Sequence, residues 1–132
     1  MVLVDVNVHL DLTTRDPVWF QWSSSKISDC RNNGMLVINP IIYAEIANAF
    51  LKEEELDRYI SPIDFVRQPL PWEAAYLAAQ AFRAYRQRGG VKSSPLPDFY
   101  IGAHAYVAGL TLLTRDAARY QTYFPNVPLI SP

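Results

Sequence analysis

Short apolar runs alternate with longer helix-like stretches throughout the sequence, and this alternation constrains the fold more than any other feature. Five runs predict strands because they are brief, rich in Val, Leu and Ile, and bounded by polar or turn-forming residues. They cover residues 1–4, 35–38, 63–67, 110–113 and 127–130. Strands separated by helices favour a three-layer α/β/α sandwich with a central parallel sheet. At 132 residues, we expect a single domain over residues 1–132.

Helices are predicted between these runs, at residues 8–12, 16–33, 41–51, 53–59, 71–88 and 98–109. The pair Asp16-Pro17 is typical of a helix start, with aspartate as N-cap and proline in the first helical position. Gly89 and Gly90 end the longest helix, and a loop at residues 89–97 leads to Asp98. Asp98 and Asp116 each precede a helix-forming stretch, so both are N-cap candidates.

The overall composition excludes several classes of protein. Half of the residues are hydrophobic and 19% are charged, which excludes a disordered chain. The formal net charge is −1, so any binding of nucleic acid must depend on local positive charge. The single Cys30 excludes an internal disulfide framework. Neither a signal peptide nor an apolar stretch of about 20 residues is present, so we expect a cytoplasmic protein without a membrane span.

Four acidic residues, Asp5, Glu45, Asp98 and Asp116, occupy positions that an α/β fold would bring together. Asp5 and Asp116 follow predicted strands, and Asp98 opens a predicted helix. The carboxyl ends of parallel strands and the amino ends of the connecting helices share one edge of the sheet. Carboxylates gathered there repel one another, and hard oxygen ligands favour Mg²⁺ or Mn²⁺. The pattern therefore predicts a metal-dependent phosphodiesterase.

Each acid also has an ordinary structural explanation. Capping alone could account for Asp98 and Asp116. Asp5 is harder to explain in this way, since a buried carboxylate needs a partner. Glu45 falls beside the apolar helix face that carries Ile42 and Ile46, which is unfavourable unless it faces a polar site.

The positive charge is local. Arg88, Lys92 and Arg115 are the candidates for holding phosphates, because they lie close in sequence to the acids. A solvated helix end that complements the helix dipole explains the same charges. Of the two histidines, His9 could approach the acids, whereas His104 is expected to be a core or interface residue.

Several short stretches together resemble the PIN domain, and more narrowly the VapC toxins of bacterial toxin–antitoxin pairs. The stretches are Asp5-x-Asn7 after a strand, Ala44-Glu45-Ile46 on a helix, Pro97-Asp98 at a helix start and Leu113-Thr114-Arg115-Asp116. The resemblance covers essentially the whole chain. It implies a PIN-like fold and a ribonuclease that uses Mg²⁺, for which Mn²⁺ substitutes.

By motif, the resemblance makes Asp5, Glu45, Asp98 and Asp116 the catalytic and metal-binding residues, with Asn7 and Thr114 as supporting polar groups. It also implies a cognate antitoxin, a homodimer, and RNA products with a 5′-phosphate and a 3′-hydroxyl. His9 stands where the family commonly has an aliphatic residue, so it could touch metal or substrate.

Two alternatives remain open. One is another acid-site phosphohydrolase, although a haloacid-dehalogenase-like phosphatase needs an aspartate where this chain has Asn7. The other is a catalytically silent PIN-like module that only binds a partner. The intact set of four acids argues against the second alternative.

Overall fold

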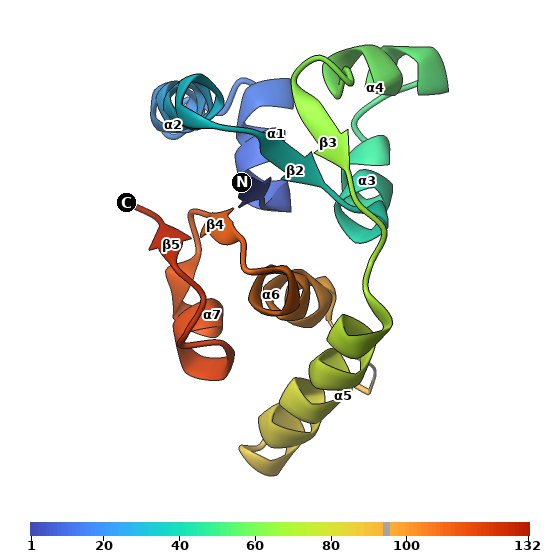
Figure 1. Cartoon of the computed structure of the whole chain (residues 1–132), viewed down its shortest axis with the longest axis vertical. Helices are drawn as coiled ribbons and strands as arrows, with labels where there is room; N and C mark the ends of the chain where they lie inside the picture. The colour runs from blue at the N-terminus through green and yellow to red at the C-terminus, as the bar shows by residue number, and fades with distance from the viewer. Residues whose placement is uncertain (94–95) are drawn as a thin grey trace.

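The central sheet has five parallel strands in the order β3-β2-β1-β4-β5 (Figure 1). A computed structural model describes residues 1–93 and 96–132. The strands are β1 (Val2–Val4), β2 (Leu36–Ile38), β3 (Phe65–Arg67), β4 (Thr111–Leu113) and β5 (Leu129–Ile130). All five lie within the runs predicted from sequence. The prediction of an α/β/α sandwich with a parallel sheet is confirmed.

Seven helices are described in these residues: α1 (Val6–Thr13), α2 (Phe20–Asn33), α3 (Pro40–Ala47), α4 (Glu53–Tyr59), α5 (Trp72–Gln87), α6 (Pro97–Ala108) and α7 (Ala117–Tyr123). In Figure 1, α1 and α2 lie on one side of the sheet, and α6 and α7 lie on the other. Helix α5 packs along α6, outside the sheet layer (Figure 1). None of the described helices is both long and apolar enough to cross a bilayer.

The core lies between the sheet and its helices. Strand residues such as Leu3, Val37 and Leu112 are fully buried, as are Ile42 and Ile46 on α3. Helix α6 packs closely against Phe124 at Gly102, where the lack of a side chain leaves room for the ring; a side chain there would overlap it. Helix α6 ends at Gly109, whose φ of 66° is the left-handed conformation that glycine adopts readily.

Several predicted helix boundaries were wrong. Asp16 caps a turn, accepting hydrogen bonds from the backbone N–H groups of Val18 and Trp19, and α2 begins only at Phe20. Helix α3 ends at Ala47 instead of residue 51. The N-cap of α6 is Leu96, which places Asp98 inside the first turn because Pro97 takes the first helical position. Residues 94 and 95 of the predicted loop 89–97 lie outside the described residues.

Candidate active site

The fold places the four predicted acids at the carboxyl edge of the sheet. Asp5 directly follows β1 and is the N-cap of α1. Strand β4 pairs with β1 through Val4 and Leu113, so Asp116 follows at the same edge. Glu45 lies on α3, which begins directly after β2, the other neighbour of β1. Asp98 lies in the first turn of α6, the helix that leads into β4.

Asp5 is the deepest of the four, with an exposed fraction of 3%. Its Oδ2 accepts hydrogen bonds from the Thr114 hydroxyl at 2.7 Å and the Tyr120 hydroxyl at 2.9 Å. Its Oδ1 accepts from the backbone N–H of Val6 at 2.8 Å. All of these donors are neutral. The carboxylate is therefore oriented from several sides, but none of these donors offsets its charge.

Burial raises the pKa of Asp5 to about 6 from its ordinary value of 3.8. The hydrogen bonds from Thr114 and Tyr120 favour the ionised form and oppose this effect, whereas the nearby carboxylate of Asp98 adds to it. Asp5 is thus a carboxylate whose charge is costly in the apoprotein. A positive charge placed beside it would be strongly favoured.

Asp98 links the remaining acids to Asp5. Burial raises the pKa of Asp98, and the guanidinium of Arg119, whose Nε lies 3.6 Å from Oδ2, opposes that effect. The negative charges of Asp116 and Glu45 raise the pKa of Asp98 further. The side chains of Asp116 and Glu45 are exposed, so they lie at the rim while Asp5 lies at the bottom.

The donor set suits a hard divalent cation, since carboxylate oxygens are what Mg²⁺ and Mn²⁺ prefer and neighbouring acids raise the pKa of both Asp5 and Asp98. Within residues 1–93 and 96–132, no three His, Cys, Asp or Glu side chains are grouped closely enough to hold an ion by themselves. Mg²⁺ usually keeps several of its waters in protein sites, so it does not need a complete protein cage.

The two predicted supporting residues connect the strand ends. The side-chain amide of Asn7 donates to the Thr114 hydroxyl at 3.3 Å, and its Oδ1 accepts from the backbone N–H of Arg115 at 3.1 Å. The Thr114 hydroxyl accepts from the backbone N–H of Asp116 at 3.0 Å while donating to Asp5. The loop that carries Asp116 is thereby fixed to the segment that carries Asp5.

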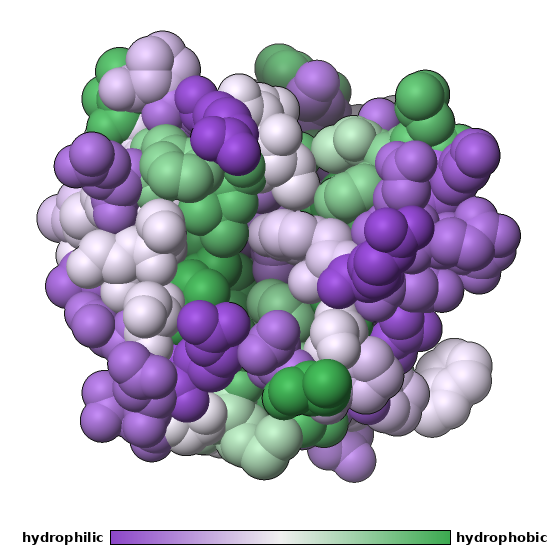
Figure 2. Space-filling model, turned by 90° about the horizontal axis from the view of Figure 1, so that it is seen from above, coloured by the Kyte–Doolittle hydropathy of each residue, from purple (hydrophilic) through white to green (hydrophobic). Residues whose placement is uncertain are grey.

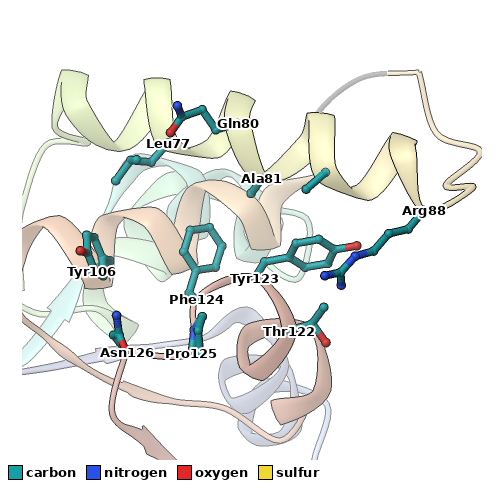
Figure 3. Close-up of a pocket in the computed structure, with 11 residues that line it drawn as sticks. Leu77, Gln80, Ala81, Arg88, Tyr106, Thr122, Tyr123, Phe124, Pro125 and Asn126 are labelled. Carbon is teal, nitrogen blue, oxygen red and sulfur yellow. The ribbon is translucent and has the colours of Figure 1, made fainter.

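The three predicted phosphate-holding residues have different surroundings. Arg88 lies over the ring of Tyr123 at 5.3 Å and lines a hollow of about 410 Å³ between α5 and the end of α7 (Figure 3). Lys92 is exposed, and its backbone carbonyl accepts from Arg86. Arg115 instead directs two donors at the carboxylate of Asp11.

A second hollow, of about 310 Å³, extends from Asp116 toward this region. Asp116, Arg119 and Tyr85 line it, and it shares Thr122 and Tyr123 with the hollow that holds Arg88. The two hollows therefore adjoin, and together they extend from Asp116 to Arg88.

Neither histidine lies among the acids. His9 is fully buried, its Nδ1 lies 2.9 Å from the Tyr59 hydroxyl, and its ring packs against Phe65. Burial lowers the pKa of His9 to about 4. His104 is buried between Asn39 and Gln68, in agreement with its prediction as a core histidine.

Three residues of this region were not among the predicted site residues: Asp11, Arg119 and Tyr120. Tyr120 follows Asp116 by four residues, so helical spacing could have placed it near the same edge. No local pattern indicates the contact of Tyr120 with Asp5, because the two are separated by 115 positions. The ion pair between Asp11 and Arg115 spans 104 positions and is equally invisible in the sequence.

Aromatic residues also remain at the surface. Five of them are not fully buried, and Tyr106 is 51% exposed; the others are Trp19, Phe20, Trp22 and Tyr43. Figure 2 views the molecule from the side of α2 and α4 and shows hydrophobic residues exposed around a central depression.

The sequence between residues 2 and 125 matches the family model of the PIN domain. The chain belongs to the PIN domain family. This confirms the family predicted from the acidic motifs. The match includes all four predicted acids and both supporting residues of this PIN domain. Among curated proteins, no sequence matches the chain.

Solved structures share the fold at low sequence identity. A chain of VapBC2 from Rickettsia felis, bound to a DNA fragment from their promoter, has a TM-score of 0.73 and 17% identity, with 99% of this chain and 98% of that chain covered. VapBC-1 from nontypeable Haemophilus influenzae has a TM-score of 0.71 and 18% identity, with 99% of this chain and 98% of that chain covered. A toxin–antitoxin complex from Klebsiella pneumoniae has a TM-score of 0.67 and 21% identity, with 98% of this chain and 96% of that chain covered. These likenesses establish the fold.

Proposed function

We propose that this PIN domain is an endoribonuclease that depends on Mg²⁺ or Mn²⁺ and acts as the VapC-type toxin of a toxin–antitoxin pair. The observation that carries the proposal is the environment of Asp5. It is buried at the carboxyl edge of the sheet, within reach of Asp98, and no cationic side chain of residues 1–93 or 96–132 pairs with it. A protein gains nothing in stability from such a carboxylate, so a role in binding a cation explains it best.

The chain's own residues divide the remaining tasks. Asp5, Glu45, Asp98 and Asp116 would hold the metal, which when bound lowers the pKa of a coordinated water and offsets charge on the scissile phosphate. Thr114 and Tyr120 keep the carboxylate of Asp5 oriented and favour its ionised form.

The adjoining hollows between Asp116 and Arg88 support a path for RNA. Arg88 and Lys92 would hold backbone phosphates. The rings of Tyr85 and Tyr123 line the path, and aromatic faces of this kind stack with bases of single-stranded RNA irrespective of sequence. Because the chain's net charge is −1, local cations have to offset the repulsion between RNA and the acids.

The toxin role further implies a cognate antitoxin, a homodimer and a cytoplasmic location, where RNA is available. The shared fold with chains of VapBC complexes and of a toxin–antitoxin complex supports the antitoxin partner. Exposed aromatic residues on α5 and α6, such as Tyr76 and Tyr106, support an interface, because aromatic side chains are enriched at interface cores.

Cleavage of RNA by the purified protein, free of any antitoxin, tests the activity. We expect cleavage with Mg²⁺ or Mn²⁺, loss of cleavage in EDTA, and loss in Asp98→Asn. Glu54→Gln is the matched control, since it removes one exposed negative charge from α4, away from the carboxyl edge. Full activity in EDTA or in Asp98→Asn would refute metal catalysis by these residues.

The same experiment distinguishes the alternatives. A silent interaction module would bind neither Mn²⁺ nor Mg²⁺ and would leave RNA intact. A small-molecule phosphohydrolase would release phosphate from monoesters with the same metals while sparing RNA. The family match favours the nuclease over the phosphohydrolase, and the intact set of four acids favours it over the silent module.

A further inference from the structure

Asp11 forms an ion pair that the proposed chemistry does not use. Its carboxylate is 1% exposed and faces the guanidinium of Arg115 at two points, with Nε 2.6 Å from Oδ2 and Nη2 2.9 Å from Oδ1. The buried hydroxyl of Ser23 on α2 donates to the same Oδ2 at 2.6 Å. A two-point pair of arginine and carboxylate fixes orientation as well as charge.

Arg115 lies between Thr114 and Asp116, at the point where β4 leads into α7. Its guanidinium also lies over the ring of Trp19 at 5.2 Å, and its backbone N–H donates to Asn7. Helix α1, the segment around α2 and the loop after β4 therefore meet at one side chain. A small displacement of that side chain would move Asp116, its neighbour in sequence.

These contacts bear on the prediction that Arg115 holds a phosphate of RNA. The pair with Asp11 compensates the guanidinium charge and occupies two of its five donors. A phosphate would have to compete with a carboxylate at 2.6 Å. The geometry thus favours an internal role for Arg115 over contact with substrate.

We propose that Asp11 and Arg115 are positioning residues that hold the β4–α7 loop so that Asp116 can serve the metal site. This inference rests on the proposed function. It predicts that the two residues act as a unit, although neither touches the metal or RNA. Partners that orient metal-binding groups typically change metal affinity or activity by 10- to 100-fold when they are replaced.

The test compares Asp11→Asn with Arg115→Gln in two binding assays that need no catalysis and in steady-state kinetics of RNA cleavage. We expect each variant to weaken Mn²⁺ affinity, measured by calorimetry without RNA, by about 10-fold. RNA affinity in EDTA should stay within about twofold of wild type, and kcat should fall while KM is little changed. Arg115→Lys keeps the charge but loses the planar pair of N–H donors that matches the carboxylate, so its Mn²⁺ affinity should lie between those of wild type and Arg115→Gln.

The opposite pattern identifies a phosphate ligand. Arg115→Gln would then weaken RNA binding in EDTA, whereas Asp11→Asn, which releases the guanidinium, would preserve or strengthen it. That result overturns the positioning role, as does an unchanged Mn²⁺ affinity in both folded variants.

A double variant guards against misfolding. The double variant Asp11→Asn with Arg115→Gln leaves no unpaired charge. If the two residues act as a unit, the double variant should lose no more Mn²⁺ affinity than either single variant. Additive losses overturn the inference. Arg67→Gln, which removes an exposed ion pair with Asp57, is the control and should leave both affinities unchanged.

The wild-type protein separates the two proposals. If the wild type binds Mn²⁺ and cleaves RNA, and the variants equal it in Mn²⁺ affinity and cleavage, only the positioning role fails. If it neither binds Mn²⁺ nor cleaves RNA, the proposed function fails, and the positioning role fails with it.

Discussion

Asp5 and Asp11 lie six residues apart, and both are buried, yet their surroundings are opposite. Asp11 faces an arginine at two points and a serine hydroxyl, so its charge is compensated inside the protein. Asp5 receives only neutral donors and lies near a second acid, so its charge is left uncompensated. The difference teaches that burial alone does not indicate function. A buried acid with a built-in cation stabilises structure, whereas one without a cation is available for an external one.

Removal of the Asp5 charge should have the largest effect. Asp5→Asn should reduce Mn²⁺-dependent cleavage of RNA by more than about 100-fold, beyond the loss typical of a residue that only orients a metal-binding group. Single-turnover cleavage assays on Asp5→Asn and Asp11→Asn measure the contrast. Equal losses in the two variants would remove the functional distinction between the two acids.

Truncation of Asp11 should cost the most stability. Asp11→Ala leaves Arg115 without its partner, and we expect a loss of about 3 kcal/mol in the free energy of unfolding. This is at the low end for buried pairs because the Arg115 side chain is 26% exposed. Urea denaturation measures it, with Asp64→Ala as control. Asp64 pairs with Arg31 at the surface, so its loss should cost less than about 1 kcal/mol.

Asp5→Asn should have the opposite effect on stability in the absence of metal. The folded-state pKa of Asp5, about 6, lies above the ordinary 3.8, so folding favours the neutral carboxyl. Ionisation of Asp5 therefore lowers the stability of the wild-type protein as the pH rises from about 4 to 6, and at pH 7.5 the variant should be more stable by about 2–3 kcal/mol. Denaturation with EDTA present tests this. A destabilised variant would contradict the account of Asp5.

His9 makes the pH dependence of this variant a sharper measurement. The folded-state pKa of His9, about 4, lies below its ordinary 6.5, so protonation favours unfolding and stability rises with pH across that window. In the wild type, the effects of Asp5 and His9 oppose each other between pH 4 and 6. Asp5→Asn should leave the His9 effect exposed, giving stability that rises more steeply with pH. Equal slopes in the two proteins would be inconsistent with the raised pKa of Asp5.

Tyr120→Phe should produce a smaller change around Asp5. It removes the hydroxyl that donates to Oδ2 and leaves the ring in the core. We expect Mn²⁺ affinity to fall by about 10-fold, because a group that orients a metal-binding carboxylate is lost. Calorimetric titration checks this. Tyr59→Phe is the control, since its hydroxyl contacts His9 and not the acids.

The smallest effect is expected at the basic residues. Arg88→Gln with Lys92→Gln should weaken RNA binding and lower the slope of log affinity against log salt by about 1.4, or 0.7 for each lost phosphate contact. Mn²⁺ affinity should not change. Arg58→Gln with Arg83→Gln removes the same charge from exposed sites on α4 and α5 and is the control. Superimposable RNA-binding curves for both double variants would show that Arg88 and Lys92 are only solvated charges at a helix end.

The sequence was most informative where the signal is local. All five strands were predicted, because a buried parallel strand requires a short run of apolar residues and the flanking residues interrupt it. The helix ends were less predictable. Asp98 resembles an N-cap in isolation, yet Pro97 takes the first helical position and shifts the cap to Leu96.

The site was predictable only in part, for a physical reason. A strand end and a helix start share one edge in any parallel sheet, so the positions of Asp5 and Asp98 follow from topology. The partners of a buried side chain depend on packing between segments that are distant in sequence. Nothing local distinguishes Arg115, which binds Asp11, from Arg88, which lines a hollow beside Tyr123.

The central place of β1 in the sheet has a consequence for the order of folding. Val2 and Leu3 pair with β2 through Leu36 and Val37, but Val2 also pairs with Thr111, more than 100 positions later. Contacts between residues so far apart form late in folding, because closing the long loop between them costs conformational entropy first. The β1–β2 pair can therefore form while Asp5 still lacks Thr114 and Tyr120. Since those two residues follow α6 in the chain, the surroundings of Asp5 are completed only after most of the molecule has already folded.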